Sequence, residues 1–170
     1  MRLAIRIMGF VTATVVSGIA LLPIAPSQAA SGEEVIKARI DFMNDEIQGH
    51  WKPLAAFVRK GAGSLADVEK NATALAKLAE KIPPHFPKDT GRGKYPDKLT
   101  RALPAIWEDW AGFEKSARML AEESEKLARL AKEGNKDAVV DLIGPSGSYA
   151  KTKIGCADCH NDFRGAAAKK

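Results

Sequence analysis

Two cysteines and a histidine near the C-terminus have a spacing that points to a specific chemistry. Cys156, Cys159 and His160 form the C-x-x-C-H pattern that is typical of covalent c-type haem attachment. The two thiols can form thioethers with the haem vinyl groups, because residues three positions apart share one face of a helix. The imidazole of His160 follows directly and can bind the iron as its proximal ligand. The chain has 2 cysteines in all, so the motif leaves no thiol unused.

Two other uses of these cysteines stay open at this point. A redox-active dithiol also has the C-x-x-C spacing, but usually inside a βαβ pattern, which this sequence does not show. In that case the chain would be a thiol protein without haem. A structural zinc site needs four ligands, whereas the motif offers two cysteines and one adjacent histidine.

The first 29 residues have the pattern of a secretory signal peptide. Arg2 and Arg6 supply positive charge, an apolar run follows, and Ser27-Gln28-Ala29 places small residues at the cleavage positions. We expect cleavage before Ala30, which predicts a periplasmic protein without a membrane segment. A retained transmembrane anchor is the alternative, because the apolar run approaches the length that spans a bilayer.

The mature chain, residues 30–170, has the size of one domain. Its net charge is below the +5 of the full sequence, because residues 1–29 contain arginines and no acidic residue. Basic residues do not alternate with aromatic ones, so we expect no binding to nucleic acid. A weakly charged surface favours transient docking with redox partner proteins. The sequence shows no catalytic pair of residues, so we do not expect an enzyme.

Apolar residues at helical spacing predict the first two helices. The first covers residues 33–60, and Pro53 is expected to kink it or to end its first half. Glycines at 61–63 end it, and Ser64 can cap the second helix. The second helix is expected to end at the prolines of residues 83–84.

Residues 83–103 are rich in proline, glycine and charge, which predicts an irregular segment that packs against the haem edge. A third helix is expected from Pro104 to the glycine and asparagine at 134–135. A fourth begins near residue 136, is broken at 144–147, and resumes near Ser148 through the haem motif. The predicted fold is all-α, an antiparallel four-helix bundle with covalently bound haem near the C-terminus.

With this motif on the last helix of such a bundle, the chain resembles the class II c-type cytochromes, the cytochrome c′ family. The segments RALPAIWEDWAGF at 101–113 and CADCHNDFR at 156–164 carry the resemblance. Arg39, followed four residues later by Met43, matches the family's arginine and distal-residue spacing. The segment 144–147 departs from the family, which usually has one unbroken helix there.

The resemblance implies one haem c with one iron, bound covalently through Cys156 and Cys159 and ligated by His160. It places Arg39 near a haem propionate and Met43 on the distal side of the iron. It also places three further side chains around the porphyrin or its proximal side: Trp107, Phe163 and Arg164. His50 and His85 are expected to be surface or loop residues.

The family has two branches that differ at the distal position. The segments KIPPHFPKDTG and LPAIWEDWAGF resemble the low-spin branch more closely, so we expect Met43 to be the sixth iron ligand and the protein to be an electron carrier. In the alternative, Met43 is an apolar core residue and the five-coordinate iron binds NO or CO, for sequestration or sensing. A homodimer is a further expectation.

Overall fold

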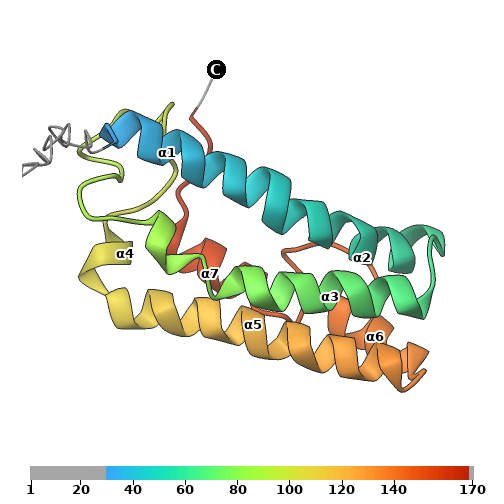
Figure 1. Ribbon diagram of the computed structural model, residues 1–170. Helices are drawn as coiled ribbons and strands as arrows, with labels where there is room; N and C mark the ends of the chain where they lie inside the picture. Colours follow the sequence, from blue (N-terminus) through green and yellow to red (C-terminus); the bar gives the residue numbers. More distant parts are fainter. Residues whose placement is uncertain (1–29, 169–170) are drawn as a thin grey trace, which may run out of the picture.

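The protein is an all-helical bundle over the residues that its structure describes. A computed structural model describes residues 30–168, and none of them lies in a β-strand. Long helical rods lie antiparallel and side by side, as Figure 1 shows. The predicted all-α bundle is therefore confirmed. The predicted signal peptide lies outside the described residues, and within residues 30–168 no helix combines the length and hydropathy needed to cross a bilayer.

The first rod consists of α1 (Gly32–Asp41), the π-helical turn η1 (Phe42–Ile47) and α2 (Gln48–Lys60). Ser31 and Glu34 form a capping box at its start. The prediction that Pro53 ends the first half of the helix is wrong, because α2 continues through it to Lys60, and the kink stays a prediction. The carbonyl of Gly49, which loses its bond to the missing N–H, belongs to an exposed residue and stays accessible to water. The irregular geometry lies in η1 instead.

The second and third rods, α3 (Leu65–Ala79) and α5 (Trp110–Lys132), make the most extensive helix–helix contact in the described chain. Ser64 caps α3 as predicted, in a capping box with Asp67. Small buried side chains let the two helices approach closely: Ala72, Ala76, Ala79, Ala117, Ala121 and Ser124.

The predicted third helix is split near its start. The turn α4 (Ala105–Glu108) precedes α5, and Asp109 between them has non-helical backbone angles. The side chain of Asp109 accepts a hydrogen bond from the Gly112 N–H at 3.0 Å, which caps α5 and competes with helix continuation. Residues 86–103 are irregular, as predicted, after the short 3₁₀ turn η2 (Pro83–His85).

The fourth layer is formed by two short helices, α6 (Lys136–Ile143) and α7 (Cys156–Phe163). α6 contacts α2 and α5, whereas α7 contacts α4 and α5. The prediction that helix resumes near Ser148 is wrong, because residues 144–155 form a loop. Gly144 and Gly155 bound this loop with left-handed φ angles of 86° and 88°, which side-chain-bearing residues rarely adopt.

Candidate haem site

A cavity of about 440 Å³ lies between the first rod, α5 and α7. Its volume falls in the range of small-molecule and cofactor sites. The walls are largely apolar and aromatic, as a flat macrocycle requires, and include Ile47, Trp51, Leu75, Ile106, Phe113 and Leu120. The cavity therefore has the size and the chemistry to hold a haem.

The helix α7 brings the predicted attachment residues to this cavity. Cys156, Cys159 and His160 all line it, and both cysteines are half-buried. Gly155 starts α7 in a left-handed conformation, with a position for a Cβ only 3.0 Å from the methyl group of Met119. The haem motif therefore begins directly after a sharp turn of the chain against α5. This turn orients α7 so that its cysteines and histidine line the cavity.

The environment of the two thiols does not favour redox or metal chemistry. Burial raises the pKa of the Cys156 thiol to about 12 and that of Cys159 to about 11. A redox-active cysteine has a lowered pKa, which stabilises its thiolate. Among the described residues no group of three or more His, Cys, Asp or Glu side chains could hold a metal ion. The dithiol and zinc alternatives therefore lose support.

His160 is held as a neutral imidazole. Burial, followed by the charges of Arg164 and Arg101, lowers its pKa to about 4. The Nη1 atom of Arg164 lies 3.5 Å from Nδ1 of His160. A neutral imidazole keeps the lone pair that a metal ligand needs. The family resemblance predicted Arg164 on the proximal side, whereas Arg101 was not predicted to lie near His160.

Arg39 is almost completely buried at the edge of the cavity, with 3% of its surface exposed. Its Nη1 donates to Thr90 Oγ1 at 3.0 Å, and its Nη2 donates to the Thr90 carbonyl at 2.9 Å and to Thr100 Oγ1 at 2.8 Å. The guanidinium also lies 4.7 Å from the ring centre of Phe86. These contacts hold the 86–103 segment against α1.

No carboxylate compensates the charge of Arg39 within the described chain. Burial lowers its pKa to about 10, and none of the described side chains that line the cavity is acidic. Three further basic residues line it: Lys98, Arg101 and Arg164. A buried cation without an anionic partner is costly, so this wall suits a ligand that carries carboxylates. The two propionates of a haem meet that requirement.

The contacts of Arg39 predict a large loss of stability when it is replaced. In Arg39→Leu the Thr90 carbonyl loses its side-chain donor, and a buried group left unsatisfied costs about 1–3 kcal/mol. The hydroxyls of Thr90 and Thr100 each lose one hydrogen bond and keep another, to the Pro87 carbonyl and from the Ala102 N–H. We expect the free energy of unfolding to fall by about 2–4 kcal/mol in urea denaturation of the purified protein. The matched control is Lys37→Leu on the exposed side of the same helix, which should change it by less than about 0.5 kcal/mol. Equal stability of Arg39→Leu and the wild type would contradict this role.

The remaining predicted residues lie in different places. Phe163 is buried in the cavity wall, with its ring edge-on to Phe113 at 5.4 Å. Trp107 does not line the cavity, because its Nε1 donates to the Phe86 carbonyl at 3.0 Å and its ring packs against Gly91. The structure therefore places Trp107 behind the cavity wall, and its contact with the porphyrin stays a prediction.

Both histidines outside the motif lie away from the cavity wall. His50 is hydrogen-bonded to Asn71, with 3.0 Å between Nδ1 and Oδ1. His85 is stacked on Phe42, with the ring centres 4.0 Å apart. Neither belongs to the residues that line the cavity.

Met43 is half-buried on η1 and lines the same cavity as His160. Its neighbours on this wall are the apolar Ile40 and Ile47 and the polar Asn44 and Gln48. The structure thus brings together seven of the eight predicted site residues, on α1, η1 and α7 and just after α7: Arg39, Met43, Cys156, Cys159, His160, Phe163 and Arg164. It adds Tyr149, whose ring lies edge-on to His160.

A helical bundle whose last helix carries a C-x-x-C-H motif at an apolar cavity defines the class II type of c-type cytochrome. A family model described as Cytochrome C′ matches residues 34–164. A cytochrome c′ of Rhodopseudomonas palustris is 33% identical over 114 residues, which are 66% of this chain and 70% of the relative. The chain therefore belongs to the cytochrome c′ family, whose members bind one haem c covalently.

Solved structures of the family have the same fold. Cytochrome c′ from Rubrivivax gelatinosus superposes with a TM-score of 0.61 at 25% identity, covering 81% of this chain and 99% of its own. A nitric oxide complex of a mutant of cytochrome c prime from Alcaligenes xylosoxidans has a TM-score of 0.61 at 23% identity, covering 81% of this chain and 98% of its own.

The prediction of a methionine-ligated electron carrier is wrong. The relatives are named cytochrome c′, a type whose iron is typically high-spin and five-coordinate, and they do not support the low-spin branch. Met43 is accordingly not an iron ligand in our assignment. Its position beside Ile40 and Ile47 is that of an apolar wall residue, a role that methionine fills readily.

Proposed function

We propose that the protein is a haem-containing gas-binding protein that takes up NO or CO, for sequestration or sensing. The observation that carries the proposal is one largely apolar cavity that has a neutral imidazole on α7 and Met43 on η1 among its lining residues. Its membership of the cytochrome c′ family supports the same function. When bound, the haem iron supplies a free coordination position for a diatomic gas.

Different residues of the cavity would bind different parts of the haem. Cys156 and Cys159 would attach it covalently, and His160 would bind the iron. Arg39, already buried at the cavity edge, compensates the charge of a propionate. Arg164 keeps a positive charge beside His160 and so tunes how strongly the imidazole donates to the iron.

Two aromatic rings complete the apolar surface. Phe163 and Phe113 are both buried and pack edge to face, which gives a rigid wall against which a porphyrin can lie. Such an apolar wall would keep water out of the cavity, and a dry cavity would favour the binding of a neutral gas over water or an anion.

Met43 is proposed to restrict access on the distal side. Met43→Ala removes most of its volume from the wall, so we expect CO to bind the reduced protein faster, on the order of tenfold, or about 1.4 kcal/mol in activation free energy. Flash photolysis or stopped-flow mixing with CO measures this rate. Met43→Leu, which keeps the volume, is the control and should bind CO at the wild-type rate. If both variants lost low-spin character in the ferric spectrum, Met43 would be a ligand and the proposal would fail.

We further propose that the protein works in the periplasm after removal of residues 1–29, and that it forms a homodimer. The signal-peptide pattern supports the location. An intact mass that matches residues 30–170 plus one haem tests the processing. Light scattering of the purified protein tests the dimer, and a monomer at all concentrations would exclude it.

A further inference from the structure

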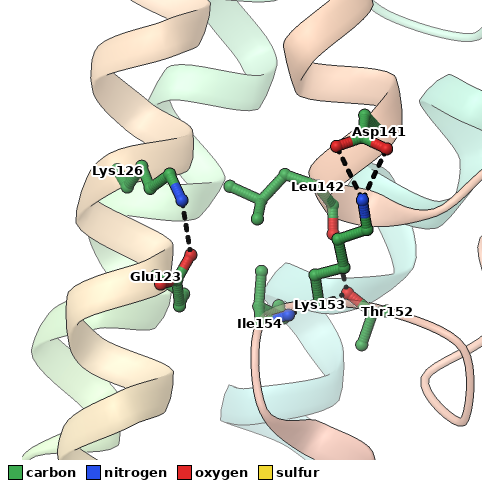
Figure 2. Close-up of polar contacts among 7 residues, drawn as sticks. All are labelled: Glu123, Lys126, Asp141, Leu142, Thr152, Lys153 and Ile154. Atoms are coloured by element: carbon green, nitrogen blue, oxygen red, sulfur yellow. Dashed lines mark hydrogen bonds and ion pairs between the residues drawn. The ribbon is translucent and has the colours of Figure 1, made fainter.

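The loop of residues 144–155 brings Tyr149 to the cavity and to the imidazole of His160. The loop is firmly attached to the end of α6, as Figure 2 shows. Thr152 is buried, and its hydroxyl donates to the Leu142 carbonyl at 3.2 Å. The Lys153 N–H donates to the same carbonyl at 3.1 Å, and the Lys153 ammonium lies 2.6 Å from a carboxylate oxygen of Asp141.

Packing also holds the loop at two further points, Gly147 and Ile154. Ile154 is completely buried. Gly147 lies so close to α2 that a Cβ there would be 2.8 Å from the Ala55 carbonyl oxygen. Because both contacts fix the backbone, the loop has a defined path between α2 and α7.

This path places Tyr149 against the imidazole of His160. The two rings meet edge to face, with their centres 5.3 Å apart and their planes at 77°. Tyr149 also lines the cavity, although 48% of its surface is exposed. An exposed tyrosine contributes little to the core, so its position is better explained by the residue that it touches.

We propose that Tyr149 is a positioning residue for His160, and the inference rests on the proposed binding of iron by this histidine. The Tyr149 ring limits rotation of the imidazole about its side-chain bonds. The Nη1 atom of Arg164 lies 3.5 Å from Nδ1 of the same imidazole and adds a second neighbour on that side of the ring. With its rotation limited by the Tyr149 ring, the imidazole would present Nε2 to the iron in one direction, which would give one well-defined iron–histidine bond.

The experiment is resonance Raman spectroscopy of the ferrous holoprotein, which reports the iron–histidine stretching band directly. We expect Tyr149→Ala to shift or broaden this band, because the imidazole gains rotational freedom. Tyr149→Phe keeps the ring and should restore the wild-type band. Lys151→Ala, an exposed change in the same loop, is the matched control and should leave it unchanged. The thermal midpoint of all three should stay within about 3 °C of the wild type.

Each result separates the inference from the function on which it rests. A wild-type band that Tyr149→Ala leaves unchanged overturns the role of Tyr149 and leaves the gas-binding proposal intact. An equal shift in Tyr149→Phe and Tyr149→Ala overturns the ring contact, because the hydroxyl would then be responsible. If the wild type shows no iron–histidine band, His160 is not the ligand and both proposals fail.

Discussion

Replacement of both Cys156 and Cys159 by alanine is expected to give a chain without covalently bound haem. The two thioethers are the covalent links that the sequence allows, because these are the only cysteines in it. Intact mass spectrometry should show the bare processed polypeptide, and a haem stain on a denaturing gel should be negative. Each single variant keeps one thiol, so it serves as a control and should retain the stain.

A haem adduct in the double variant would show that the attachment lies elsewhere. Covalent haem attachment would also be contradicted if the wild-type protein, made in cells that mature other c-type cytochromes, had the mass of the polypeptide without a haem. The thiol-protein alternative would then be the better explanation, although the raised pKa values of both cysteines argue against it.

The haem-free chain is expected to lose its cooperative unfolding transition. An apolar cavity of about 440 Å³ left empty would cost up to about 10 kcal/mol, at about 24 cal/mol for each Å³. That upper value equals the whole stability of a typical domain, about 5–15 kcal/mol. We therefore expect the double cysteine variant to keep far-ultraviolet circular dichroism and to lose the near-ultraviolet signal.

The holoprotein is the reference for this measurement, under the same buffer and heating rate. A sharp transition of the haem-free chain at the holoprotein's midpoint would contradict the cavity's role in stability. In that case the contact between α3 and α5, the most extensive between helices of the described chain, would be enough to stabilise the fold without the cofactor.

Much of this fold follows from local patterns that a sequence displays. The capping serine of α3, the start of α6 after residue 135 and the irregular segment after residue 83 were all predicted from capping residues, prolines and helical spacing. The C-x-x-C-H motif likewise needs no tertiary information, because its five residues are consecutive. Local signals of this kind are strong since the residues that cooperate are close in the chain.

Features that depend on distant partners were not predicted. Arg39 finds its hydrogen-bond partners 51 and 61 residues away, at Thr90 and Thr100, and no spacing rule connects them. Trp107 donates to the Phe86 carbonyl and does not line the cavity, and this partner is also distant in the sequence. Tyr149 reaches His160 through a loop whose path is set by packing against α2. These contacts exist only once the helices have assembled.

Met43 shows a second limit of prediction from the sequence, which concerns the role of a residue and not its position. A methionine on an apolar helical face has the same spacing whether its sulfur binds iron or only fills space. The sequence of this chain could not separate the two roles, and the resemblance to the low-spin branch led to the wrong one. The family relationship corrected it.

The titration of the ferrous holoprotein with CO, followed by visible absorption, tests the central claim most directly. A free coordination position opposite His160 predicts saturable binding of one CO per haem in the wild type, with no mutation needed to open the site. A spectrum that stays unchanged up to saturating CO, together with a methionine–iron charge-transfer band in the ferric protein, would contradict it.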